Sequence, residues 1–90
     1  MTNITFSREA LKFVKQLDSK PARQVYEKTL ALLLDPHPQS ATELRGFKGF
    51  LRLRVGNYRV IYSKSSELIR VVLIDNRSDD DVYKHLDRLN

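Results

Sequence analysis

The chain has 90 residues, 41% of them apolar, and a formal net charge of +5. This length fits a single domain over residues 1–90 with one modest core, and the apolar fraction excludes a wholly disordered chain. Because the sequence has no cysteine, it can form neither a disulfide framework nor a thiolate metal site. Its two histidines, His37 and His85, are isolated in the sequence, so we expect no metal and no cofactor.

The sequence also bears on the compartment. No apolar run approaches the roughly 20 residues that a membrane-spanning helix needs. The N-terminal residues MTNITFSREALKF lack the basic and then apolar order of a signal peptide. We therefore expect a cytoplasmic protein with no membrane partner.

The first third of the chain predicts a strand followed by two helices. Residues 3–6 are β-prone, Ser7 is a typical N-cap, and apolar residues recur at helical spacing from Arg8 to Leu17. Pro21 fits the first turn of a second helix that runs to about Leu34. The apolar stripe of that helix consists of Ala22, Val25, Tyr26, Thr29, Leu30 and Leu33. Two amphipathic helices joined by a short break predict an α-hairpin that packs on another layer.

The segment after the helices predicts loops around a short strand. Asp35-Pro36-His37-Pro38 ends the second helix, since each proline disfavours helix in the residue before it. We expect His37 in a surface loop. Residues 41–45 are a candidate strand, and residues 46–49, Gly-Phe-Lys-Gly, predict a turn.

The strongest pattern lies at residues 50–62, FLRLRVGNYRVIY. Two alternating runs flank Gly56-Asn57, which is typical of a β-hairpin with a two-residue loop. One face of this hairpin is apolar and pairs Val55 with Tyr58, Leu53 with Val60 and Leu51 with Tyr62. The other face, which we call the arginine face, carries Arg52, Arg54 and Arg59. Arg54 lies opposite Arg59, and because like charges in this position destabilise a strand pair, an anionic ligand is the simplest compensation.

A second hairpin is predicted to follow. Ser65-Ser66 is its expected centre, which places Lys64 opposite Glu67 as a favourable charge pair. In this register the apolar face gains Ile69, Val71 and Leu73, and the arginine face gains Arg70, Val72 and Ile74. The arginine face is then partly apolar, as expected of a concavity or a partner site.

The tail predicts a helix from about Asp80 to Leu89. Asp79, Asp80 and Asp81 at its start complement the helix dipole. Its short apolar stripe consists of Val82, Leu86 and Leu89.

The positive charge is concentrated in one part of the chain. Between Arg45 and Arg70 lie seven basic residues and one acidic residue, a net charge of +6, so the rest of the chain sums to −1. The positive excess therefore lies on the predicted sheet. Such a localised field favours a phosphate-rich partner.

From Thr5 to Leu86 the chain resembles the RelE branch of the RelE/ParE toxin superfamily. Three stretches carry the resemblance: LRGF at 44–47, LRLRVGNYRVIY at 51–62, and the spacing of Arg77 to Tyr83 in NRSDDDVY. The resemblance implies an α+β fold of order β-α-α-β-β-β-α, in which a largely antiparallel sheet packs against an N-terminal α-hairpin with a C-terminal helix.

The resemblance also implies an activity. RelE-type toxins of type II toxin–antitoxin systems cleave mRNA in the ribosomal A site without a metal, by attack of a ribose 2′-OH on its own 3′-phosphate. The products are a 2′,3′-cyclic phosphate and a 5′-OH. The catalytic residues carried over by position are Arg52, Arg54, Arg59, Arg77 and Tyr83, and the expected RNA-binding residues are Arg45, Lys48 and Arg70. Guanidinium groups match phosphate oxygens two at a time, which suits this chemistry.

The chain departs from the family pattern at two places. Relatives often carry a lysine as general base where this chain has Arg52 and Arg54, and arginine keeps its proton in proteins. Lys48 or His85 is then the candidate base, or the 2′-OH is activated by position and electrostatics, or cleavage is slow or absent. Acidic residues 79–81 stand where many members have histidine, arginine or lysine.

Two further functions stay open from the sequence. One is a ParE-like inhibitor of DNA gyrase that cuts no RNA, and the other is a degenerate relative that only binds nucleic acid. The resemblance implies the same partners in each case. They are a small RelB-like antitoxin and operator DNA reached through the antitoxin complex, together with the ribosome and mRNA for a cleaving toxin. We expect an acidic helical segment of the antitoxin to cover part of the arginine face.

Overall fold

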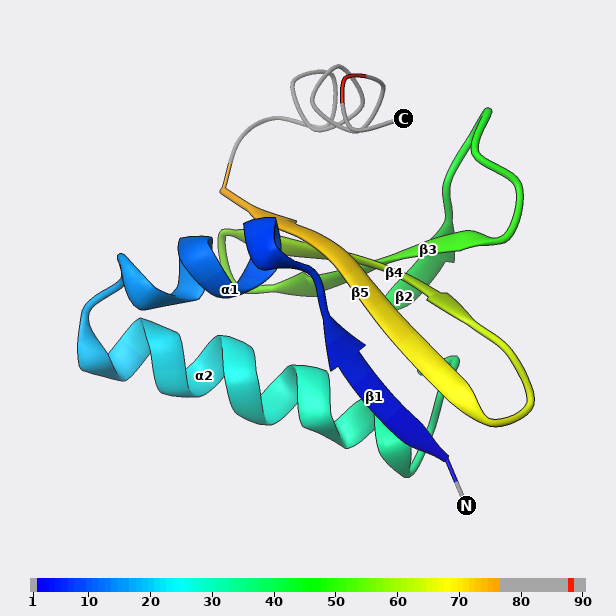
Figure 1. Cartoon of the computed structure of the whole chain (residues 1–90), viewed down its shortest axis with the longest axis horizontal. Helices are drawn as coiled ribbons and strands as arrows, with labels where there is room; N and C mark the ends of the chain where they lie inside the picture. The colour runs from blue at the N-terminus through cyan, green and yellow to red at the C-terminus, as the bar shows by residue number, and fades with distance from the viewer. Residues whose placement is uncertain (1, 77–87, 89–90) are drawn as a thin grey trace.

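A computed structural model of the chain describes residues 2–76 and residue 88. Within this part the elements in order are β1 (Asn3–Phe6), α1 (Arg8–Lys15), α2 (Ser19–Leu30), a 3-10 turn (Ala31–Leu33), β2 (Ala41–Glu43), β3 (Phe50–Val55), β4 (Tyr58–Lys64) and β5 (Leu68–Asp75). Both helices lie on the same side of one sheet (Figure 1). The predicted α+β architecture is therefore confirmed.

The five strands of the described residues form one sheet of order β1-β5-β4-β3-β2. β1 pairs with β5 in parallel, and the other neighbours are antiparallel. The candidate strand at 41–45 forms the short edge strand β2, so that four strands follow the helices where the family order has three. The sheet places β4, the strand that carries Arg59, at its centre.

The two helices begin and end close to the expected residues. Ser7 caps α1, since its Oγ accepts a hydrogen bond from the Ala10 N–H at 3.0 Å. α2 begins at Ser19, so Pro21 lies in its first turn, and it ends at Leu30 with a 3-10 turn in place of the last predicted turn. Leu34 is 92% exposed and takes no part in the core.

The core lies between the helices and the face of the sheet that they cover, which we call the helix face. Its fully buried side chains include Val25 of α2, Tyr62 of β4 and Ile69 of β5. Phe6 stacks on Tyr26 with ring centroids 5.6 Å apart, which joins the edge strand β1 to α2. Tyr26 itself stays 45% exposed, so it lies at the margin of this core.

The β3–β4 hairpin has the predicted register. Val55 pairs with Tyr58, Leu53 with Val60 and Leu51 with Tyr62, and Arg54 lies opposite Arg59. Gly56 has φ +58° in the two-residue turn, a conformation that glycine adopts without steric cost. The apolar and arginine faces of this hairpin are therefore as the sequence predicts.

The predicted position of the turn in the β4–β5 hairpin is wrong. The Ser65 N–H donates to the Leu68 carbonyl at 2.8 Å, so Ser66 and Glu67 form the centre of the turn. Lys64 consequently pairs with Ile69, not with Glu67. Tyr62 pairs with Val71, two residues beyond the partner that the sequence indicated.

A β-bulge then reverses the faces at the end of β5. The register shifts between Tyr62, which pairs with Val71, and Ile61, which pairs with Leu73, so Val72 is the extra residue. Leu73 therefore shares the arginine face with Ile61, and Ile74 packs in the main core. This is the opposite of the predicted placement of both residues. The Ser7 Oγ–H donates to the Val72 carbonyl at 2.8 Å and ties the bulge to the start of α1.

Candidate functional site

The arginine face carries a row of charged residues near the Gly56-Asn57 turn. The register places Arg54 of β3 opposite Arg59 of β4, and Arg59 opposite Asp75 of β5. Arg54 is exposed, Arg59 is half-buried and Asp75 is only 3% exposed. Arg59 therefore stands between a like charge and a carboxylate, which offsets part of the repulsion within the arginine pair.

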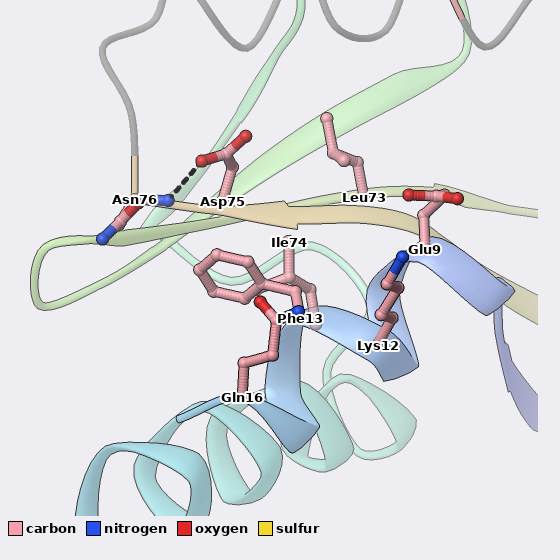
Figure 2. A pocket seen from close by; sticks show the side chains of 8 residues that line it. All are labelled: Glu9, Lys12, Phe13, Gln16, Leu73, Ile74, Asp75 and Asn76. Carbon is pink, nitrogen blue, oxygen red and sulfur yellow. Dashed lines mark hydrogen bonds between the residues drawn. The ribbon is translucent and has the colours of Figure 1, made fainter. Parts of the chain in front are cut away.

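Asp75 is the residue of this row that the sequence did not reveal. Figure 2 shows its side chain pointing away from Phe13 and α1, because the bulge has turned it to the arginine face. Its Oδ1 accepts a hydrogen bond from the Asn76 N–H at 2.7 Å. The only sequence signal is an acidic residue directly after the apolar run of β5, two positions before Arg77.

The next row combines one arginine with apolar residues. Thr42 pairs with Arg52, and Arg52 pairs with Ile61, which in turn pairs with Leu73. Ile61 and Leu73 are buried with Leu44 in a second, smaller cluster, against which Phe47, Phe50 and Val72 pack. The arginine face is thus partly apolar, as predicted, with Val72 and Leu73 in place of the expected Val72 and Ile74.

A shallow depression lies at the open edge of the sheet beside these rows. Its volume is about 520 Å³, and its lining consists of Ser40, Thr42, Arg52, Arg54 and Gly56. We call it the edge depression. Among the described residues, Arg54 has no hydrogen bond or ion pair, so its guanidinium is available to a ligand.

The predicted RNA-binding residues Arg45, Lys48 and Arg70 lie apart from the row of Arg54, Arg59 and Asp75. Lys48 lines a separate hollow of about 400 Å³, with His37, Phe47 and Lys64 among its other walls. Arg45 is exposed in the loop between β2 and β3, and Arg70 pairs with Ser63 at the end of β5 remote from Asp75. The structure does not bring Lys48 together with Arg54 and Arg59. Arg77, Tyr83 and His85 lie outside the described residues.

A smaller pocket of about 240 Å³ lies between α1 and the end of β5 (Figure 2). Glu9, Lys12 and Gln16 of α1 line one side, and Asp75 and Asn76 form the end of the other. Within residues 2–76 and 88, no three or more His, Cys, Asp or Glu residues are grouped as a metal ion would require. None of the described helices is long and apolar enough to cross a membrane.

Tyr62 is the one described residue with a clearly shifted pKa. Burial, and then the nearby Asp35 carboxylate, raises the pKa of Tyr62 to about 12. Its O–H donates to the Pro36 carbonyl at 2.8 Å, and the side chain is fully buried on the helix face. Tyr62 therefore holds the loop after α2 against the sheet and has no access to a ligand on the arginine face.

Solved structures of several toxins share this fold. The RelE–RelB complex from Pyrococcus horikoshii OT3 matches with a TM-score of 0.74 and 24% identity, over 87% of this chain and 97% of that chain. The intact Escherichia coli RelBE toxin–antitoxin complex matches with a TM-score of 0.71 and 24% identity, over 87% and 99%. The Staphylococcus aureus YoeB dimer matches with a TM-score of 0.72 and 20% identity, over 86% and 98%. The fold is that of the RelE/ParE toxin superfamily.

A match to a family model shows to which family of this superfamily the chain belongs. The model of the ParE toxin of the type II toxin–antitoxin system, parDE, matches residues 4–81, so the chain belongs to this family. A search of curated proteins found no match. The superfamily indicated by the sequence is therefore confirmed: the matching family model is that of ParE, while the structural neighbours above are RelE and YoeB proteins.

Proposed function

We propose that this toxin arrests growth by cleaving mRNA on the ribosome. The observation that carries the proposal is the row of Arg54 and Arg59 on the face of the sheet opposite to α1 and α2. Two guanidinium groups brought together there, at a cost in stability, provide the charge and the paired donors that a phosphodiester requires. Relatives of the same fold include RelE and YoeB toxins, which supports this assignment.

The reaction that we assign is an internal transfer at one phosphodiester. The ribose 2′-oxygen forms a bond to the adjacent phosphorus, the bond to the 5′-oxygen of the next nucleotide breaks, and the 2′-proton leaves to a base while the 5′-oxygen gains a proton. Arg52, Arg54 and Arg59 stabilise the negative charge that develops on the phosphorane oxygens. Arg77 and Tyr83 complete the site by their match to the family pattern.

The general base of this reaction has more than one candidate. Lys48 lies in a hollow that contains neither Arg54 nor Arg59, which disfavours it. His85, or activation of the 2′-OH by position and charge, is then the better account. Arg52 and Arg54 serve as charges and not as bases, since arginine keeps its proton.

Induction of the toxin in growing cells tests the proposal. Primer extension on a translated message should show new 5′ ends in phase with codons. Replacement of Arg59 and Arg77 by alanine should abolish both the ends and the growth arrest, while Arg8→Ala, an exposed arginine of α1, should retain them. Growth arrest without any new 5′ ends would refute cleavage.

Inhibition of DNA gyrase is the second candidate function. Two observations favour it: the chain matches the ParE family model, and no lysine lies in the charged row of Arg54, Arg59 and Asp75. A supercoiling assay with purified toxin decides between the two functions. Unaffected gyrase would eliminate this candidate.

We further propose that a small antitoxin neutralises the toxin by covering some of Arg52, Arg54, Arg59 and Arg77 with an acidic helical segment. Relatives with this fold are known in complex with RelB antitoxins, and the pair would also bind operator DNA through the antitoxin. The open reading frames next to the gene are the first place to look for this partner. A complex that leaves all four arginines exposed would refute neutralisation by occlusion.

A further inference from the structure

We propose that the edge depression is a binding subsite for an RNA phosphodiester, in which the hydroxyls of Ser40 and Thr42 act together with Arg54. The inference rests on the proposed RNA cleavage and adds two contact residues to it. Neither hydroxyl belongs to the set that the family resemblance carries over to this chain.

The short edge strand β2 and the turn before it place these hydroxyls beside the arginines. Thr42 pairs with Arg52 across the β2–β3 ladder, so it stands on the arginine face. Ser40 lies in the turn, two residues before Thr42. Both residues line the depression together with Arg52 and Arg54.

The hydroxyls of the depression have no other partner in the described part of the chain. Ser7, Thr29 and Ser65 each donate to a backbone carbonyl. No hydrogen bond of this kind involves the Ser40 Oγ or the Thr42 Oγ1, and both residues are exposed. Their donors and that of Arg54 are thus free to bind a ligand.

The lining of the depression favours a nucleic-acid backbone over a protein segment. Phosphate oxygens are commonly bound by arginine together with serine and threonine hydroxyls. A helical protein partner anchors itself through apolar side chains, and no apolar side chain lines this depression. The separate hollow that contains Lys48 differs in this respect, because Phe47 and Phe50 form part of its wall.

A binding measurement with an uncleavable probe tests the inference. The purified toxin is titrated into a short, fluorescently labelled RNA whose riboses are 2′-O-methylated, at several salt concentrations. The Ser40→Ala/Thr42→Ala double variant should bind about tenfold more weakly, with an unchanged dependence on salt. Arg54→Gln should also weaken binding and should lower the slope of log affinity against log salt by about 0.7, since one phosphate contact is lost.

Matched variants separate this subsite from the rest of the sheet. Ser66→Ala removes an exposed hydroxyl in the β4–β5 turn and should leave binding unchanged. If the double variant binds RNA like the wild type while Arg54→Gln is weakened, the hydroxyls are not contacts, although RNA binding stands. If the wild type does not bind RNA, the subsite fails, while primer extension on a translated message decides separately on the proposed cleavage on the ribosome. If the double variant loses affinity for the antitoxin alone, the depression belongs to that partner and the inference is wrong.

Discussion

The two faces of the sheet use the same strands for different purposes. On the helix face, Val60, Tyr62 and Ile69 are fully buried in a continuous apolar core. On the arginine face, the strands carry a charged row of Arg54, Arg59 and Asp75 beside a small apolar cluster. Because successive residues of a strand point to opposite faces, burial on one side and charge on the other coexist in the same segment.

If the arginine face binds the ligand as proposed, this difference separates stability from ligand binding in the toxin. Substitutions on the helix face should act on the free energy of unfolding, since they remove buried surface. Substitutions in the charged row should act on binding and leave the fold intact, because the arginines there oppose one another. Four variants, ordered by the expected change in the free energy of unfolding, test this separation.

The largest effect is expected from Ile69→Ala. Ile69 is fully buried on the helix face, and removal of its methylene and methyl groups should cost about 3 kcal/mol of the free energy of unfolding. Chemical denaturation measures this change. Leu34→Ala, at a residue that is 92% exposed, should change stability by less than about 0.5 kcal/mol. Equal losses in the two variants would contradict the position of the core.

Ser7→Ala should have the next largest effect. The Ser7 hydroxyl accepts from the Ala10 N–H and donates to the carbonyl of Val72, the bulge residue. Removal of this hydroxyl should lower the free energy of unfolding by about 1–2 kcal/mol, because the helix cap and the hydrogen bond to the bulge are lost. Chemical denaturation measures this change. Ser7→Thr retains a hydroxyl and should recover most of the loss. A variant as stable as the wild type would show that neither bond matters.

Tyr62→Phe should lower the free energy of unfolding by about 1 kcal/mol near neutral pH, because the hydrogen bond to the Pro36 carbonyl is lost. It should also change the response to alkali. The pKa of Tyr62 is raised to about 12, so between pH 10 and 12 the unfolded chain releases this proton while the folded chain retains it. This contribution to stability is complete below pH 10 and decreases as the pH rises towards 12.

The Tyr62→Phe variant lacks the titrating hydroxyl, so its free energy of unfolding relative to the wild type should rise between pH 10 and 12. Denaturation at a series of pH values measures this difference. Tyr26→Phe, at a residue 45% exposed, serves as the control for general alkaline destabilisation. Parallel curves for the wild type and Tyr62→Phe would refute the role of burial.

The smallest effect is expected from Arg54→Gln. Removal of one of two opposed charges should leave the free energy of unfolding unchanged or raise it by a few tenths of a kcal/mol. Arg70→Gln is the matched control, since Arg70 pairs with Ser63 and has no like charge opposite. Thermal unfolding at low salt, where surface charges are least screened, measures both variants. Clear destabilisation by Arg54→Gln would show that this arginine supports the fold.

The sequence predicted the β3–β4 hairpin because two independent signals agree there. Strict alternation defines the faces of each strand, and Gly56-Asn57 defines the turn that aligns them. The arginine face follows directly, since Arg52, Arg54 and Arg59 occupy the polar positions of that alternation. This is why the central part of the candidate site could be located without a structure.

The β4–β5 hairpin shows where such reasoning fails. Residues 71–74, Val-Val-Leu-Ile, are all apolar, so alternation cannot show which of them points to which face. Two adjacent serines at 65–66 left the centre of the turn ambiguous by one residue. The bulge residue Val72 accepts a hydrogen bond from Ser7, a contact between distant parts of the chain that no local pattern encodes.

The same limit applies to the site. Asp75 reaches the arginine face only because the bulge has reversed the end of β5, so its place beside Arg59 could not be predicted from the register expected. Lys48 was grouped with the arginines by its charge and its position in the sequence. The loop between β2 and β3 instead directs it into a separate hollow. Charge composition locates a basic region but does not resolve its parts.

The pairing of β1 with β5 has a consequence for folding of the toxin during its synthesis. The bond between Ser7 and Val72 spans 65 residues, and β1 is parallel to β5, so the first and the last strands of the described residues pair with each other. Contacts this distant in sequence form late, because the intervening chain must first be present and ordered. The sheet, and with it the row of Arg54, Arg59 and Asp75, cannot be completed until translation has passed β5.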